Sequence, residues 1–157
     1  MLFRSNTARP NALVAEAFRE NKLAPLIGYE TLRPEVAYGK ASRVDFLASG
    51  GGRPPCHVEV KNCHLMRRPG LAEFPDCVAA RSARHMMDLA AVVEAGGRAM
   101  VIIVVQMWAD RFDAARDLDP AFDRALQTAR AAGVAVYAHR CRIDPGGITV
   151  ADAIPVL

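Results

Sequence analysis

The sequence lacks any long apolar segment. Its longest apolar run, Ala99–Val105, ends at Gln106 and is far shorter than the roughly eighteen residues that a membrane-spanning helix needs. The first eleven residues have no apolar signal core, because polar residues and Pro10 interrupt them. We therefore expect a cytoplasmic protein with no membrane partner.

Paired cysteines in a CxxC arrangement are also absent. The four cysteines are scattered along the chain, which predicts free buried thiols. Cys56-His57 and Cys63-His64 look like repeated ligand pairs. However, adjacent residues on a strand point to opposite faces, and this spacing fits no ordinary zinc site. We therefore do not expect zinc.

The chain has little excess charge and little lysine. The net charge of +3 is a weak indication of a nucleic-acid partner. Seventeen of the twenty basic residues are arginine, whose planar fork suits phosphate, although a genome-wide arginine bias explains the same count. Internal repeats and a domain-splitting linker are missing as well. A chain of 157 residues that is 52% hydrophobic is predicted to form one globular domain over residues 1–157, with homo-oligomers left open.

Hydrophobic periodicity and turn residues predict eight elements. The pattern indicates helices over 6–22, 76–94 and 120–132, and strands over 31–37, 43–48, 56–61, 100–107 and 134–143. Asn6 or Thr7 is expected to cap the first helix, Pro75 to begin the second, and Asp119 to cap the third. The order α-β-β-β-α-β-α-β predicts an α/β fold in which a mixed sheet is flanked by helices.

Three charged residues lie on two strands that are predicted to be neighbours. Asp45 interrupts an apolar strand, and Glu59 and Lys61 share one face of the next strand because side chains alternate. Two adjacent carboxylates repel each other unless a cation such as Mg²⁺ or Mn²⁺ lies between them. Such an ion, with the Val60 carbonyl as a third ligand, would serve phosphodiester hydrolysis, and Lys61 would position water or stabilise the transition state. A surface hairpin with alternating charges is the alternative.

Asp45, Glu59 and Lys61 match the PD-(D/E)XK nuclease motif, and the wider sequence resembles the sugar fermentation stimulation protein A (SfsA) family. The matching segments are 34–39, 42–47, 58–61 and 74–76, with Arg81, His85, Gly133-Val134 and 154–156, and with Asn6-Thr7, Asn11 and Glu16-Ala17 in the first helix. The resemblance implies a restriction-endonuclease-like core that binds DNA. It supports a Mg²⁺-dependent nuclease acting on DNA or RNA.

The same resemblance leaves other functions open. The alternatives are a DNA-binding regulator of sugar metabolism genes that does not cleave, and a remnant that keeps only the fold. Family members carry a small barrel domain of the OB type before this region, whereas five residues precede Asn6 here, so we expect weak nucleic-acid binding. Ala79 and Ser82 also replace the Thr and Gly that the family has near its arginine.

Several residues are expected to support the site. Glu16 would reach the metal through water, with a solvated helix face as the alternative. Arg81 and His85, four residues apart on one helix face, would bind phosphate. Arg43 would bind phosphate on the face of Asp45 or pair with Glu35. Residues with weaker expectations are Asn6 and Asn11 as caps, Arg67 and Arg68 as a solvated loop, His57 as a structural residue, and Met86, Met87 and Trp108 as packing residues.

Overall fold

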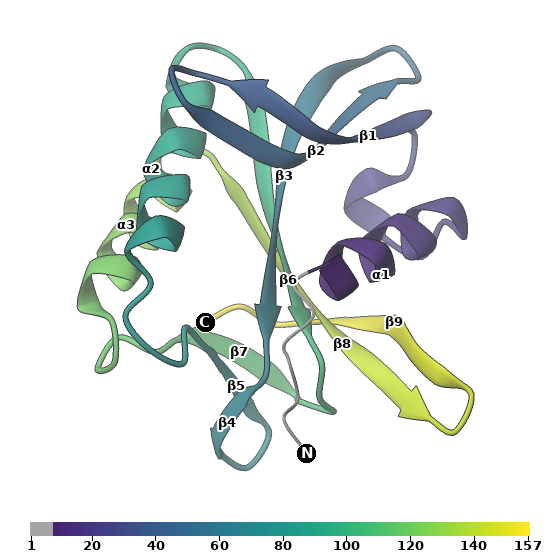
Figure 1. Cartoon of the computed structure of the whole chain (residues 1–157), viewed down its shortest axis with the longest axis vertical. Coiled ribbons are helices and arrows are strands. Elements are labelled where there is room, and N and C mark those ends of the chain that lie inside the picture. The colour runs from purple at the N-terminus through teal and green to yellow at the C-terminus, as the bar shows by residue number, and fades with distance from the viewer. Residues whose placement is uncertain (1–7) are drawn as a thin grey trace.

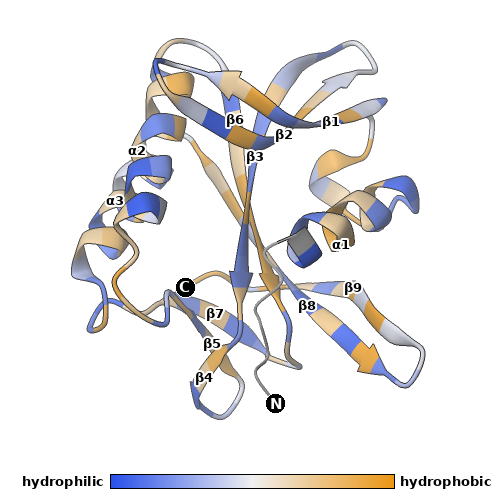
Figure 2. Cartoon of the chain, in the orientation of Figure 1, coloured by the Kyte–Doolittle hydropathy of each residue, from blue (hydrophilic) through white to orange (hydrophobic). Residues whose placement is uncertain are grey.

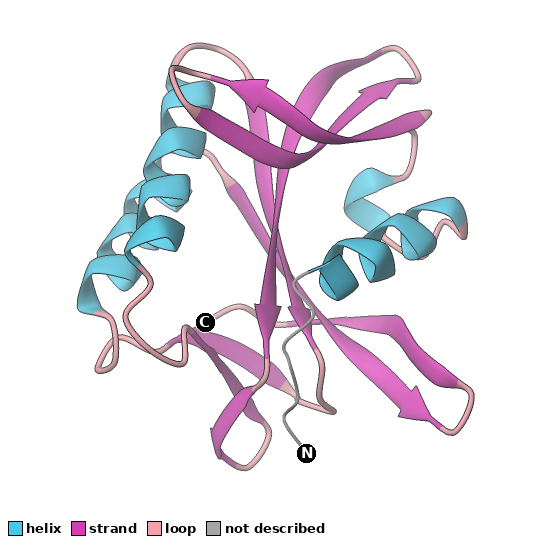
Figure 3. Ribbon diagram, in the orientation of Figure 1, coloured by secondary structure: helices cyan, strands magenta, loops and turns pink. Residues whose placement is uncertain are grey.

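The computed structural model describes residues 8–157, and its main feature is a six-stranded mixed sheet (Figure 1). The strands are ordered β1-β2-β3-β6-β8-β9, with β3, β6 and β8 parallel and an antiparallel hairpin at each edge. Helices α2 and α3 lie together on one face, and α1 covers the other (Figure 3). The predicted α/β class, a mixed sheet flanked by helices, is confirmed.

The elements include several that the sequence pattern did not reveal. The helices are α1 (Ala8–Arg19), the short 3-10 helix η1 (Ala24–Leu26), α2 (Ala80–Glu94) and α3 (Pro120–Ala132), and the strands are β1 (Thr31–Tyr38), β2 (Ser42–Gly50), β3 (Arg53–Cys63), β4 (Leu65–Arg68), β5 (Leu71–Phe74), β6 (Arg98–Val105), β7 (Arg111–Ala114), β8 (Ala135–Asp144) and β9 (Gly147–Ile154). Strands β4, β5 and β7 form a second small sheet. The predicted order was therefore incomplete, and the expected caps Asn6 and Thr7 lie outside the described residues.

Strand β6 is the centre of the core. It lies between β3 and β8, and its apolar residues alternate between two buried clusters. Val101 and Ile103 pack beneath α2 and α3, while Ile102 and Val104 pack beneath α1. Figure 2 shows the contrast between hydrophobic β6 and the hydrophilic carboxyl end of β3 beside it. A strand covered on both faces is nearly continuous in apolar residues, as β6 is.

Helix α2 begins at Ala80, four residues later than predicted, and Pro75 is not its first residue. Strand β5 extends to Phe74 because it pairs with β7. The Asp119 side chain, which caps α3 by accepting from Phe122 N at 3.0 Å, also accepts from Ala79 N at 2.8 Å. The start of α2 is therefore set by contacts from a distant segment. At the end of α3, Gly133 has the left-handed φ of 110° that the predicted stop requires.

Four surface expectations were wrong. Cys77 is exposed, whereas the other three thiols are buried and free. Met87 and Trp108 are 46% and 56% exposed, so they are not core residues, although the Arg140 guanidinium lies 3.6 Å from the Trp108 ring centre. Arg67 lies in β4 rather than a loop, and it forms ion pairs with Glu73 and Asp117.

Among the described residues, no helix is long and apolar enough to span a bilayer.

Candidate metal centre

Strand β2 separates from β3 at Asp45, and this separation creates the site. The last pair of the ladder in this direction is Phe46 with Val58. Beyond it, the Val60 N–H donates to Asp45 Oδ2 at 2.7 Å, so a carboxylate replaces the backbone acceptor of the missing strand. A strand residue directs its N–H and C=O towards the same neighbour, so the Val60 carbonyl also faces the opened side. Figure 1 shows the end of β3 continuing past the β1–β2 hairpin.

Strand β2 also rotates at Asp45. Val44 packs in the cluster beneath α2 and α3, whereas Phe46, two residues later, packs in the cluster beneath α1. Residues two apart share a face in a regular strand, so the strand must twist between them. Across the hairpin, the regular pairing is interrupted at Glu35, which has a left-handed φ of 52°. The irregular backbone leaves Asp45 half-buried at the point where β2 departs from β3.

Glu59, Lys61 and His85 form a buried polar cluster. Lys61 Nζ lies 3.0 Å from Glu59 Oε1 and 3.1 Å from His85 Nδ1, and His85 Nδ1 lies 2.8 Å from the same Glu59 oxygen. Arg81 Nε donates to His85 Nε2 at 3.5 Å, and together with the short Nδ1–Glu59 contact this favours the tautomer in which Nδ1 carries the proton. Glu59, Lys61 and His85 are each at most 9% exposed, whereas Arg81 is exposed.

The two carboxylates have opposite pKa shifts. The pKa of Asp45 is raised by burial and by the negative charge of Glu59, against which the hydrogen bonds from Val60 and Asn11 act. Burial also raises the pKa of Glu59, but the hydrogen bond from His85 and the charge of Lys61 outweigh it, and the net shift is downwards. Glu59 is thus held ionised beside a carboxyl group that resists ionisation. Added positive charge near Asp45 would relieve that resistance.

One oxygen of this cluster has no hydrogen-bond partner among residues 8–157. Glu59 Oε1 accepts from His85 and Lys61, whereas Glu59 Oε2 is buried without a hydrogen bond. A buried, unpaired carboxylate oxygen is costly unless a cation or another donor satisfies it. Within the described part of the chain, Asp45 Oδ1 accepts one hydrogen bond, from Asn11 Nδ2 at 3.1 Å. Both carboxylates therefore keep lone pairs available for a ligand.

A cavity of about 370 Å³ opens at this point between α1, β2, β3 and α2. Its lining residues are Pro10, Asn11, Asp45, Glu59, Val60, Lys61, Asn62, His64, Phe74, Asp76, Arg81, Ser82 and His85. Within residues 8–157, no group of three or more His, Cys, Asp or Glu side chains is arranged to hold a metal ion. The Cys56-His57 and Cys63-His64 pairs form no such group either. Two carboxylates and one carbonyl nevertheless fit Mg²⁺, which usually retains several waters and binds through one or two carboxylates.

Comparison with known proteins identifies the family. The family model described as "Sugar fermentation stimulation protein RE domain" matches residues 8–147. The chain belongs to this family. Two sugar fermentation stimulation protein homologs illustrate the relationship. The homolog from Methylorubrum populi is 76% identical over 152 residues, covering 97% of this chain and 62% of its own length. The homolog from Caulobacter vibrioides is 51% identical over 150 residues, covering 95% of this chain and 63% of its own length.

A solved structure of the same family agrees with the fold. SfsA from Pyrococcus furiosus, determined in complex with Ca²⁺, superposes with a TM-score of 0.84 at 25% identity. The match covers 96% of this chain and 65% of that one. The chain thus spans less than two thirds of the length of the family members that it matches.

The fold brings most of the expected site residues together. Asp45, Glu59, Val60, Lys61, Arg81 and His85 all line the cavity. Glu16 and Arg43 do not. Arg43 does not share the face of Asp45 because β2 rotates between them, and its Nη1 donates instead to the Glu35 carbonyl oxygen at 3.4 Å. On α1, it is Asn11 rather than Glu16 that contacts Asp45.

Several polar residues of the cavity were missed by the sequence interpretation. Asn62 Oδ1 accepts from Gln106 Nε2 at 2.8 Å, which joins the ends of β3 and β6. His64 Nε2 lies 3.4 Å from Asp76 Oδ2 at the mouth of the cavity. The only available signal for Asn62 and His64 was their position immediately after Lys61. Nothing in the sequence pattern indicated that Asp76, expected inside a helix, would face them.

Proposed function

We propose that this domain is a metal-dependent nuclease that hydrolyses phosphodiester bonds of DNA, or alternatively RNA, using Mg²⁺ or Mn²⁺. The observation that carries the proposal is Glu59 Oε2, which is buried without a partner among the described residues. It lies on β3 where β2, which carries Asp45, stops pairing with that strand. Support also comes from the Ca²⁺ complex of the Pyrococcus furiosus relative, since Ca²⁺ and Mg²⁺ both take oxygen ligands.

Each residue has a role that follows from its contacts. Asp45, Glu59 and the Val60 carbonyl would hold the cation, which when bound supplies Lewis acidity and lowers the pKa of a coordinated water. His85 donates to Glu59 Oε1 and thereby keeps this carboxylate in one orientation, with Oε2 as the free oxygen. A residue that holds a metal ligand in this way commonly contributes 10- to 100-fold to affinity or activity.

Two cations would act on the phosphate itself. Lys61 Nζ uses one donor on Glu59, and its other N–H groups are placed to stabilise charge on a phosphoryl oxygen or to position the attacking water. Arg81 lies at the exposed edge of the cavity, where its planar guanidinium suits a phosphate oxygen pair. The contacts of His85 favour a role in orienting Glu59 over the phosphate binding expected from the sequence.

A cleavage assay tests the proposal. Supercoiled plasmid, single-stranded DNA and RNA are incubated with the domain in Mg²⁺, Mn²⁺ or EDTA. The wild type is expected to cleave at least one substrate in the presence of metal and none in EDTA. Glu59→Gln should abolish cleavage, and Lys61→Met should reduce the rate by about 10²- to 10³-fold, the usual loss for a group that stabilises transition-state charge.

Lys22→Met is the matched control, because Lys22 is half-exposed and paired only with Glu20, outside the cavity. It should cleave like the wild type. Nucleic-acid binding without cleavage in any metal would instead identify the domain as a non-cleaving binding module, and it would remove hydrolysis from the proposal.

A further inference from the structure

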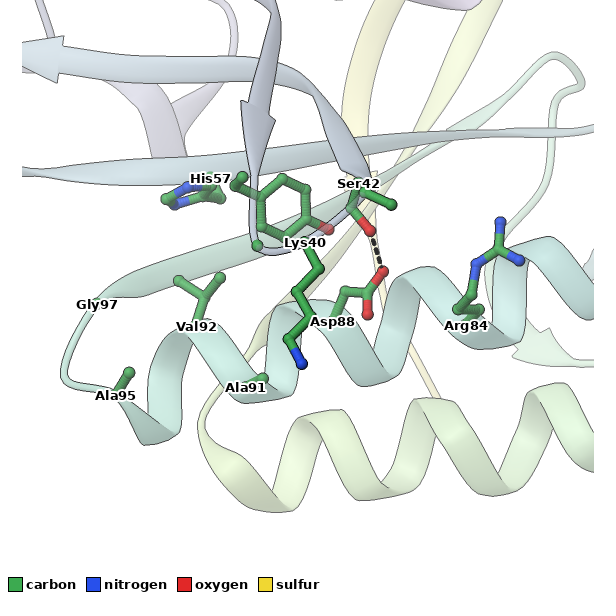
Figure 4. A pocket seen from close by; sticks show the side chains of 12 residues that line it. Lys40, Ser42, His57, Arg84, Asp88, Ala91, Val92, Ala95 and Gly97 are labelled. Carbon is green, nitrogen blue, oxygen red and sulfur yellow. Dashed lines mark hydrogen bonds between the residues drawn. The ribbon is translucent and has the colours of Figure 1, made fainter.

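A second and larger cavity, of about 900 Å³, is lined by residues that are close in sequence to those of the candidate metal centre. Figure 4 shows the side chains that line it. It is enclosed by the β1–β2 turn, by β3 and by the second half of α2. Its lining residues are Tyr38, Gly39, Lys40, Ala41, Ser42, His57, Arg84, Asp88, Ala91, Val92, Ala95 and Gly97. This volume lies within the range of cavities that bind small organic molecules.

Residues of β3 and α2 line both cavities. His57 precedes Glu59 by two residues, so both lie on one face of β3, separated by about 6.6 Å along the strand. On α2, Arg84 lines the larger cavity while its neighbour His85 lines the metal centre. The two cavities therefore lie about one nucleotide apart, so a polymer bound at the metal centre could place its next unit near His57.

The interior of the larger cavity is suited to a flat ring with polar edges. Its walls are mostly apolar, and the Tyr38 and His57 rings lie with their centres 5.1 Å apart. His57 Nδ1 is buried without a hydrogen-bond partner among the described residues. Unpaired buried polar atoms are costly, and a ligand that pairs with them would gain affinity. Nucleobases combine a stacking surface with donors and acceptors at their edges.

Charged groups at the mouth favour a phosphorylated ligand. Figure 4 shows Lys40 reaching from the turn towards α2, and Arg84 on that helix; both residues are exposed. Asp88 lies deeper and accepts a hydrogen bond from Ser42, which leaves its remaining acceptor capacity for an amino group of a base. A purely apolar ligand would use none of these groups.

We propose that this cavity binds the base of an unpaired nucleotide next to the phosphate that is cleaved. The proposal rests on the proposed nuclease function and names its substrate class, a single-stranded or unstacked nucleic acid. Tyr38 and His57 form the base-binding wall, and Lys40 and Arg84 contact the flanking phosphate. A base inside a regular duplex is stacked and cannot enter.

Calorimetric titrations test the base-binding cavity apart from cleavage. The full chain is titrated in EDTA with dAMP, with dTMP and with deoxyribose 5-phosphate, which lacks the base. At least one mononucleotide should bind roughly 5- to 150-fold more tightly than deoxyribose 5-phosphate, the range expected for one base stacked on an aromatic side chain. Proton NMR should show the ring signal of His57 shifting during the same titration.

Two tryptophan variants locate the binding. Ala91 is an exposed α2 residue that lines the cavity, so Ala91→Trp fills the cavity without entering the core. It should reduce mononucleotide affinity to that of deoxyribose 5-phosphate. Ala131→Trp, at an exposed position of α3 outside the cavity, should bind like the wild type. If Ala91→Trp does not fold, Arg84→Gln serves instead, and it should weaken binding of both phosphorylated ligands while preserving their affinity ratio.

The outcomes separate this proposal from the nuclease proposal. Equal affinity for mononucleotides and deoxyribose 5-phosphate, or wild-type mononucleotide binding by a folded Ala91→Trp, overturns the base-binding cavity even if the domain cleaves DNA. Base-dependent binding that Ala91→Trp abolishes supports the cavity even if no metal produces cleavage, and the nuclease proposal would then fail alone.

Discussion

Replacing Lys61 with methionine tests whether its ammonium holds the buried cluster together. Methionine keeps most of the aliphatic volume but removes the charge that lies 3.0 Å from Glu59 Oε1. Glu59 and Lys61 are 3% and 8% exposed, so the remaining carboxylate cannot recover its hydration. Removing one partner of a buried ion pair costs about 3–5 kcal/mol. We expect the low end, about 3 kcal/mol, because His85 still donates to Glu59.

Thermal and urea unfolding, followed by circular dichroism, measure this loss. For a domain of this size, about 3 kcal/mol corresponds to a decrease in Tm of about 6–12 °C. The double variant Lys61→Met, Glu59→Gln should recover much of the loss, since the glutamine carbonyl still accepts from His85 and no charge stays unpaired. The control Lys22→Met removes a half-exposed partner of Glu20, and it should change stability by less than about 1 kcal/mol.

A Lys61→Met protein as stable as Lys22→Met would show that the Lys61 ammonium does not hold the buried cluster together. A double variant that lost as much stability as the sum of its single variants would show that Lys61 and Glu59 are not coupled.

Two further predictions concern the metal. Mg²⁺ or Mn²⁺ should raise the Tm of the wild type by mass action, and the double variant Asp45→Asn, Glu59→Gln should lose this increase; equal increases in both proteins would contradict joint binding by the two carboxylates. The same thermal assay should depend on pH, since the pKa of Asp45 is raised by burial and by Glu59. The protonated carboxyl does not bind a cation, so the Mg²⁺-dependent increase should decline as the pH falls towards the raised pKa of Asp45, before the ordinary value of 3.8 is reached. In metal-free protein, Asp45 has the opposite effect on the pH dependence of stability. Ionised Asp45 opposes folding above its folded-state pKa, and protonation at lower pH removes that penalty. An increase in Tm that stays constant down to pH 3.8 would show that Asp45 does not bind the ion.

The local pattern of residues was sufficient to predict the α/β class and the central members of the candidate site. Alternation placed Glu59 and Lys61 on one face of β3, and the continuous apolar run of β6 predicted a strand covered on both faces. These features depend on local periodicity, which a single sequence records directly. The cap at Asp119 and the stop at Gly133 were predictable for the same reason.

Contacts between distant segments establish which other residues reach the candidate site. The rotation of β2 at Asp45 removes Arg43 from it, and the packing of α1 brings Asn11 to Asp45 instead of Glu16. His85 was expected at a phosphate, but α2 places it against Glu59. These contacts join residues more than twenty positions apart. They depend on where the strands separate and how the helices pack, and local periodicity carries no record of either.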